Sequence, residues 1–126
     1  MEGKYRKNHF QGVATVVKKL FQLVAPHFAF FGEKDLQQLQ IIKHITRQLD
    51  SGIKIMGVPT VRDDSGLAIS SRNKRLNTLE LEKAKLLYQS LLYIRKNFTK
   101  KTVRLLKDDI KLKFRNQSEL KLEYLE

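Results

Sequence analysis

The sequence predicts an α/β fold in which a parallel sheet is followed by the start of a small α+β domain. Over residues 1–58 the apolar patterns alternate in the order helix, strand, helix, strand. Two strands joined by a helix in this way are parallel neighbours linked by a right-handed crossover, as in open α/β sheets. The chain has 126 residues, of which 41% are hydrophobic. This suffices for the core of one ordinary domain and excludes both a large multidomain protein and a disordered one.

The first helix and the first strand are predicted on either side of Pro26. The apolar residues before Pro26 recur at helical spacing and comprise Val13, Val16, Val17, Leu20, Phe21 and Val24. This spacing is typical of a helix with one buried stripe. Residues 27–31 (HFAFF) are a short, aromatic-rich apolar run that stops at Gly32. The run predicts a buried strand followed by a turn.

A second helix and a second strand follow Gly32. Helical spacing returns in Leu36, Leu39, Ile42, Ile45 and Leu49. Asp35 and Gln38 stand where an N-cap and its capping-box partner are expected. Residues 53–58 (IKIMGV) are a β-branched run that predicts the second strand.

The remainder of the chain is predicted to contain a loop, two helices and a final strand. Residues 60–76 lack a long apolar period and are rich in Asp, Ser, Gly and Arg, which predicts a functional loop. Asn77 and Glu80 form a capping signal for a helix that reaches about Asn97. Its predicted apolar face comprises Ala84, Leu87, Tyr88, Leu91 and Phe98.

A further helix is marked by Val103, Leu106, Ile110 and Phe114. Residues 120–125 alternate as a strand does. The loop separates two compositions, so we divide the chain into residues 1–76, an α/β part with its loop, and residues 77–126, the beginning of a smaller α+β domain.

Positive charge predominates, with 25 Lys and Arg against 13 Asp and Glu and a net charge of +12. Because a basic surface attracts polyanions, a non-catalytic module that binds nucleic acid or another polyanion is the alternative function. We disfavour it because the basic residues between Lys83 and Lys121 lie mostly on the polar faces of the predicted helices. No aromatic RNA-binding pattern or zinc-finger spacing occurs.

The composition also bears on compartment and metals. No run approaches the roughly 18 apolar residues of a membrane helix. The sequence has no cysteine, and its three histidines, His9, His27 and His44, are separated. These observations exclude disulfides and thiolate metal sites and disfavour a histidine-built centre. We expect a cytoplasmic protein with no membrane partner and no metal ligands of its own.

Residues 32–38 (GEKDLQQ) are the first candidate site, since open α/β sheets bind ligands at the carboxyl ends of their strands. Gly32 would let a ligand approach the backbone, Lys34 would neutralise phosphate oxygens, and Asp35 would accept hydrogen bonds from ribose hydroxyls. The alternative interpretation is structural: a turn glycine, a surface lysine and an N-cap aspartate.

Residues 66–73 (GLAISSRN) are the second candidate group, in the predicted loop, and include Ser70, Ser71 and Arg72. Two hydroxyls and a planar guanidinium hold a triphosphate well and stabilise charge on a leaving pyrophosphate, which indicates phosphoryl or adenylyl transfer. The alternative is a Ser-rich turn before a helix. Because the two groups follow consecutive strands, the βαβ geometry predicts that they surround one crevice.

Four blocks of the sequence resemble the pantothenate synthetase (pantoate:β-alanine ligase) family in order and spacing. They are residues 9–17 (HFQGVATVV), residues 30–35 (FFGEKD) with Gln37 and Gln38, residues 57–62 (GVPTVR), and residues 66–68 (GLA) with residues 70–73 (SSRN). The resemblance covers roughly residues 5–92. It implies a partial Rossmann-like sheet of the nucleotidyltransferase type. By the same resemblance, residues 1–76 are the later half of the nucleotide-binding α/β domain with its loop, and residues 77–126 begin the smaller C-terminal α+β domain.

The resemblance implies an ATP-dependent ligase, with Mg²⁺ acting through the ATP phosphates. The carboxylate of pantoate attacks the α-phosphate of ATP to give pantoyl adenylate and pyrophosphate, and the amine of β-alanine then displaces AMP. The resemblance further implies a homodimer for the full-length family.

The resemblance also implies roles for individual residues. ATP would be contacted by Gly32, Glu33, Lys34, Asp35, Val61, Ile69, Ser70, Ser71 and Arg72. The expected catalytic residues are Lys34, Ser70, Ser71 and Arg72. Lys34 would lie near the phosphates and Asp35 at the ribose, while Val61 would meet adenine through its backbone. Residues 69–72 would form a flexible KMSKS-like loop, and Gln38 would hydrogen-bond pantoate.

The sequence departs from the family pattern in places. It contains no H-x-G-H motif, which the family has upstream of the matching part. Leu36 stands where an aromatic residue is usual, and Ile69 where methionine is common. We therefore expect a middle segment of the enzyme with little or no ligase activity alone. For His9 we favour a structural role over a substrate contact.

Overall fold

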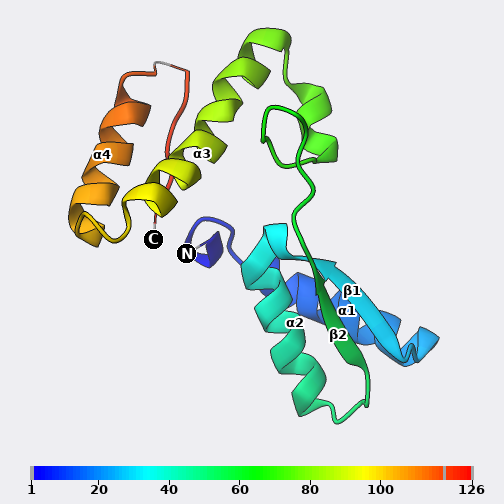
Figure 1. Cartoon of the computed structure of the whole chain (residues 1–126). Coiled ribbons are helices and arrows are strands. Elements are labelled where there is room, and N and C mark those ends of the chain that lie inside the picture. Colours follow the sequence, from blue (N-terminus) through cyan, green and yellow to red (C-terminus); the bar gives the residue numbers. More distant parts are fainter. Residues whose placement is uncertain (1, 118, 126) are drawn as a thin grey trace. The chain divides into compact units, whose positions relative to one another are not determined.

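The computed structural model describes residues 2–117 and 119–125. The chain forms two compact units, Met1–Thr60 and Val61–Glu126. The first contains η1 (Glu2–Lys4), α1 (His9–Val24), β1 (Phe28–Gly32), η2 (Glu33–Asp35), α2 (Leu36–Gln48) and β2 (Lys54–Val58), where η marks a 3-10 helix (Figure 1). The second contains η3 (Ser71–Arg75), α3 (Thr78–Asn97) and α4 (Val103–Arg115). The predicted functional division at residue 76 stays a prediction.

The two strands form the predicted parallel pair. Phe28 is paired with Lys54 at one end of the register, and Gly32 with Val58 at the other. The helix between the strands is α2, so the βαβ order is confirmed. Both strands end at the same edge of the sheet, beside the start of α2.

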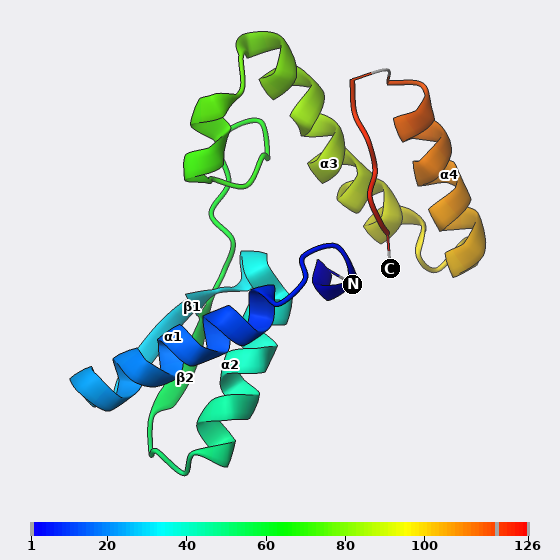
Figure 2. The same cartoon turned by 180° about the vertical axis from the view of Figure 1, so that it is seen from behind.

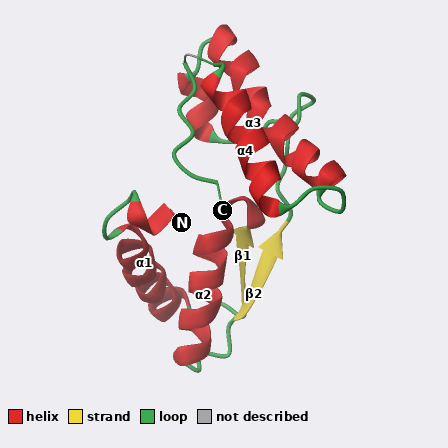
Figure 3. Ribbon diagram, turned by 90° about the vertical axis from the view of Figure 1, so that its left-hand side faces the viewer, coloured by secondary structure: helices red, strands yellow, loops and turns green. Residues whose placement is uncertain are grey.

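Helices α1 and α2 lie on the same face of this sheet (Figure 3), and α1 runs across it in the view from behind (Figure 2). The rings of Phe21 in α1 and Phe31 in β1 meet edge to face at 6.4 Å. The opposite face carries the exposed side chains Phe28, Phe30, Met56 and Val58. The prediction of a buried strand at residues 27–31 is therefore wrong for Phe28 and Phe30, because α1 and α2 cover the other face of the sheet.

The residues that flank helix α1 on either side have left-handed backbone conformations. Asn8 precedes it with φ 61°, and Ala25 follows it with φ 45° and donates its amide to the carbonyl of Phe21. Pro26 comes next, as expected of a helix end. The predicted apolar stripe is present but is not buried: Val16 is 59% exposed and Val24 is 68% exposed. Amphipathic spacing predicted the helix correctly, while its burial depends on neighbours that the described residues do not supply.

Helix α2 supplies the core of the first unit. Leu39, Ile42 and Thr46 are buried on the face toward the sheet. The hydroxyl of Thr46 donates to the carbonyl of Ile42 at 2.8 Å, which satisfies this buried polar group. The rigid α2 therefore fixes the position of the turn that joins it to β1.

Helices α3 and α4 form the core of the second unit. The predicted capping box is confirmed: Asn77 Oδ1 accepts from the Glu80 amide at 2.9 Å, and Glu80 Oε2 accepts from the Asn77 amide at 2.8 Å. The buried apolar side chains of this unit are Leu67, Ala84, Leu106, Ile110 and Phe114. The predicted apolar face of α3 is corrected, since Leu87, Leu91 and Phe98 are at least half exposed and the buried residues of α3 are Ala84 and Ser90.

The strand predicted for residues 120–125 does not form. A strand needs a neighbour for its backbone N–H and C=O groups, and β1 and β2 form the only sheet in the described part of the chain. Leu120, Leu122 and Tyr124 instead line a hollow together with residues of α3 and α4.

Candidate functional site

The first candidate group lies where β1 gives way to α2. Residues 33–35 form the single 3-10 turn η2 between Gly32 and α2. Lys34 Nζ and Asp35 Oδ2 are 3.4 Å apart, and their side chains are 39% and 60% exposed. The group therefore stands at the carboxyl end of a parallel strand, as predicted. We call residues 32–35, together with Gln38, the strand-end segment.

The backbone at position 32 does not require a glycine. Its backbone has φ −68° and ψ 132°, an extended conformation that any residue adopts. No atom lies within 4 Å of the position that a Cβ would take. The backbone of Gly32 thus borders open space, which agrees with the ligand-approach interpretation and contradicts the turn-glycine alternative.

Asp35 occupies the N-cap position of α2 but does not cap it. Its side chain accepts no capping hydrogen bond, so the predicted capping box with Gln38 is wrong. The physical reason is the tight η2 turn, which gives Asp35 φ −100° and ψ 60° instead of the extended backbone of ordinary N-caps. The carboxylate lies beside Lys34 and stays exposed, so capping does not explain this aspartate.

Glu33 lies against the neighbouring strand. Its Oε1 is 3.0 Å from the position that a Cβ on Gly57 would take, and Leu39 Cδ2 is 3.3 Å from the same position. Gly57 therefore leaves room for the Glu33 side chain at the end of β2. The expected ATP contact of Glu33 stays a prediction.

Gln38 lines an open hollow of about 550 Å³ in the first unit. The other lining residues belong to the start of α1 and the chain before it: Lys7, Asn8, His9, Gly12, Val13, Val16 and Val17. His9 is half-buried and opens α1. From the sequence we expected a structural role for His9. Its place in residues 9–17, which resemble the family pattern, was a signal that it could belong to the site. The hollow is thus lined by the amide of Gln38, the imidazole of His9 and the side chains of three valines.

The second candidate group lies in the loop of the second unit. An antiparallel bridge pairs Arg62 with Ala68, and the Ile69 amide donates to the Val61 carbonyl at 2.9 Å. Val61 and Ile69, both expected to contact ATP, are therefore side by side. We call Val61, together with residues 69–72, the loop segment.

Ser70 begins the 3-10 helix η3. Its Oγ accepts from the Arg72 amide at 3.3 Å, and its carbonyl accepts from the Asn73 amide at 3.0 Å. The turn interpretation therefore accounts for Ser70. The side chains of Ser71 and Arg72 are exposed, and the turn presents them to solvent.

Asp63 stabilises the same loop from its other end. One oxygen of its carboxylate accepts from the Ser65 hydroxyl at 2.6 Å and from the Leu67 amide at 3.1 Å. The Ser65 hydrogen bond, more than the backbone bonds or the charge of Lys85, holds the pKa of Asp63 below its ordinary value. Internal hydrogen bonds thus connect residues 61–69 of this loop, and the expected flexibility of residues 69–72 stays a prediction.

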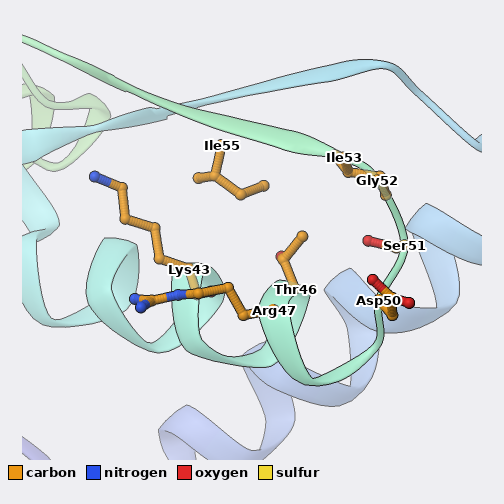
Figure 4. A pocket seen from close by; sticks show the side chains of 8 residues that line it. All are labelled: Lys43, Thr46, Arg47, Asp50, Ser51, Gly52, Ile53 and Ile55. Carbon is orange, nitrogen blue, oxygen red and sulfur yellow. The ribbon is translucent and has the colours of Figure 1, made fainter.

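The strand-end segment belongs to the first unit and the loop segment to the second. Their predicted meeting around one crevice stays a prediction. A separate hollow of about 440 Å³ lies at the amino end of β2, lined by Lys43, Thr46, Arg47, Asp50, Ser51, Gly52, Ile53 and Ile55 (Figure 4). It contains none of the predicted site residues.

In the described ranges, no three His, Cys, Asp or Glu side chains are grouped so that they could hold a metal ion. Within those same ranges, no helix has both the length and the apolar character needed to cross a bilayer.

The chain is similar to known proteins over its whole length. A sequence model of the pantoate-beta-alanine ligase family matches residues 1–126. Pantothenate synthetase of Christiangramia forsetii is 44% identical over 126 residues, which are all of this chain and 44% of that protein. The crystal structure of pantothenate synthetase from Thermus thermophilus superposes with a TM-score of 0.93 at 43% identity, over 99% of this chain and 46% of that one.

A further solved structure was obtained with ligands. Pantoate-beta-alanine ligase from Francisella tularensis, complexed with "Beta-gamma ATP" and β-alanine, superposes with a TM-score of 0.73 at 37% identity, over 90% of this chain and 42% of that one. The chain thus spans less than half the length of these relatives.

The parallel βαβ unit, with its strand-end segment, is part of a nucleotidyltransferase-like α/β fold. Within that fold, the family match extends across both units. The chain belongs to the pantoate-β-alanine ligase family.

Proposed function

We propose that this chain supplies the strand-end and loop segments of a pantoate-β-alanine ligase site, in which ATP drives the condensation of pantoate with β-alanine. The observation that carries the proposal is Gly32, whose extended backbone borders open space immediately before Lys34 and Asp35. No turn requires a glycine at position 32, and Asp35 does not cap α2. The Francisella relative, solved with an ATP compound and β-alanine, supports the same chemistry.

The first step forms an acyl adenylate. A carboxylate oxygen of pantoate attacks the α-phosphorus of ATP, and the bond from that phosphorus to the pyrophosphate oxygen breaks. Negative charge accumulates on the phosphate oxygens, so cationic and hydroxyl donors lower the barrier. Lys34 of the strand-end segment and Ser70, Ser71 and Arg72 of the loop segment are the donors we assign to this role.

Other residues hold the substrates. Asp35 accepts from the ribose hydroxyls, and Val61 meets adenine through its backbone. We assign Gln38 a hydrogen bond to pantoate in the hollow beside His9. Val13 and Val17 also line this hollow, and we assign them contacts with the two methyl groups of pantoate. Gly32, Glu33 and Ile69 complete the ATP contacts.

The second step forms the amide. The amine nitrogen of β-alanine attacks the acyl carbon, the bond from that carbon to the oxygen of AMP breaks, and the amine loses a proton. We further propose that Mg²⁺ reaches this site through the ATP phosphates, as the resemblance to the family implies. When bound, it would offset phosphate charge in the first step.

Removal of two cations tests the nucleotide site. ATP is titrated calorimetrically into the chain and into the double variant Lys34→Met and Arg72→Met. Each charged hydrogen bond contributes about 1.5–3 kcal/mol, so the affinity should fall roughly 10-fold or more. The matched control is Lys19→Met with Lys74→Met, which also removes one exposed cation from each unit and should leave ATP affinity unchanged.

The alternative function, polyanion binding, predicts a different pattern. Both double variants would weaken binding to duplex DNA equally, with an affinity that falls steeply as salt rises. ATP binding that is lost equally in both double variants, or absent throughout, would contradict the ligase proposal.

A further inference from the structure

Arg62 connects the loop of the second unit to helix α3. Its Nη1 donates to the carbonyl of Gly66 at 3.1 Å, and its guanidinium carbon lies 4.3 Å from the centre of the Tyr88 ring. Both side chains are half-buried. A guanidinium that stacks on a ring and also donates to a carbonyl is restricted to one orientation.

Gly66 brings the backbone of the loop against the same ring. Its φ of +86° lies in the left-handed region that favours glycine. A Cβ at this position would overlap the Tyr88 ring. Tyr88 therefore contacts Arg62 and sits directly against the Gly66 backbone, so the turn of the loop is attached to α3 through two neighbouring contacts.

The attached turn leads directly to the loop segment. Arg62 is bridged to Ala68 in the opposite arm of the loop. On one side of this bridge the Ile69 amide donates to the Val61 carbonyl at 2.9 Å. On the other side the Asp63 amide donates to the Leu67 carbonyl at 3.0 Å. Leu67 is 8% exposed and anchors its arm in the core. Ser70 follows within two residues of this bridge. Any shift of the Arg62 arm would therefore move Val61 and residues 69–72 together.

We propose that Arg62 and Tyr88 are positioning residues that hold the loop segment in the arrangement in which it contacts ATP. They act through the backbone of the loop, because Arg62 is committed to Gly66 and Tyr88. The proposal rests on the ligase function proposed above and adds to it two residues that have no assigned role in that reaction.

The first measurement is amide hydrogen exchange, which reports on the loop without any ligand. Arg62→Met and Tyr88→Leu should raise the exchange rate of the Ile69 and Leu67 amides at least 10-fold, while the amides of α4 keep their protection. Tyr88→Phe keeps the ring and should stay within 2-fold of the wild type. Arg104→Met removes an exposed arginine of α4 and is the matched control.

The second measurement is calorimetric titration of ATP into the same variants. Arg62→Met and Tyr88→Leu should weaken ATP binding at least 10-fold, with Tyr88→Phe and Arg104→Met near the wild-type affinity. Unchanged exchange at Ile69, or faster exchange with unchanged ATP affinity, overturns the positioning role. A wild-type chain that binds no ATP overturns the proposed function itself, and hydrogen exchange then still decides whether Arg62 and Tyr88 hold the loop.

Discussion

Gly32 and Gly66 are glycines of the two candidate regions, but different physical needs account for them. Gly32 is extended and has open space beside it, so neither its backbone nor its neighbours exclude a side chain. Gly66 has φ +86° and lies against the Tyr88 ring. The fold therefore accounts for Gly66, whereas for Gly32 we propose a ligand contact.

Alanine at each glycine separates these two needs. Gly32→Ala should change the free energy of unfolding by no more than about 0.5 kcal/mol and weaken ATP binding, because its methyl group enters the ligand space. Gly66→Ala should destabilise the chain by about 2 kcal/mol or more, since it combines a strained φ with overlap. Urea unfolding and ATP titration measure both. A large stability loss at Gly32 would show that this glycine is structural.

Single residues also show what sequence could and could not predict at the site. The place of Lys34 and Asp35 at a strand end followed from the apolar run before them, which is a local signal. The failure of Asp35 to cap α2 did not, because the η2 turn depends on how β1 meets α2. The neighbourhood of His9 and Gln38 depends on the packing of α1 against α2, which residue spacing does not encode.

At the scale of elements, a polar cluster joins α3 to α4. Tyr93 of α3 donates its hydroxyl to Asp109 Oδ2 of α4 at 2.6 Å. Lys101, between the helices, donates to the same carboxylate oxygen at 2.7 Å and to the Tyr93 hydroxyl at 2.8 Å. The Lys101 bond first, and then the Tyr93 bond, hold the pKa of Asp109 below its ordinary value, while the Asp109 bond raises the pKa of Lys101.

These shifts predict how stability depends on pH. The lowered pKa of Asp109 contributes stability that is present above about pH 4 and is lost as pH falls through the folded pKa. The raised pKa of Lys101 contributes stability that is complete below about pH 10 and is lost only as pH rises through the folded value. The measurement is the urea concentration at half-unfolding as a function of pH. In Asp109→Asn this midpoint should fall less steeply as the pH is lowered below about 4.

Asp108→Asn is the control for this measurement, because Asp108 is the exposed neighbour on the same helix. It should keep the acid dependence of the wild type. Equal flattening by the two substitutions would show that general charge, and not the Asp109 cluster, sets the pH dependence.

The predictability of elements follows the range of the interactions that form them. The Asn77 cap and the helix at α4 were predictable, since caps and apolar periods are local. The parallel pair was predictable because two strands joined by a helix are parallel neighbours. The strand at residues 120–125 was not, because a strand needs a partner. The exposure of Val16 and Val24 in α1 was likewise not predictable, because periodicity indicates a buried face but not what covers it.

At the scale of the whole molecule, two facts bear on activity. The chain matches its family throughout, yet it spans 44% of the Christiangramia relative. An apolar sheet face and the stripe of α1 are exposed, as is typical of surfaces that meet another protein segment. A ligase site depends on donors fixed in place before the reaction, and this chain matches less than half of the relative's length. We expect the chain alone to release little or no pyrophosphate.

The most direct test is ATP- and pantoate-dependent pyrophosphate release by the purified chain, with and without the part of the Christiangramia pantothenate synthetase that lies outside the match. The account predicts release only in the mixture, and its loss when the chain carries Lys34→Met with Arg72→Met. The control variant Lys19→Met with Lys74→Met should keep the release. A folded chain that binds its complement but yields no pyrophosphate would contradict the central claim that these segments belong to a ligase site.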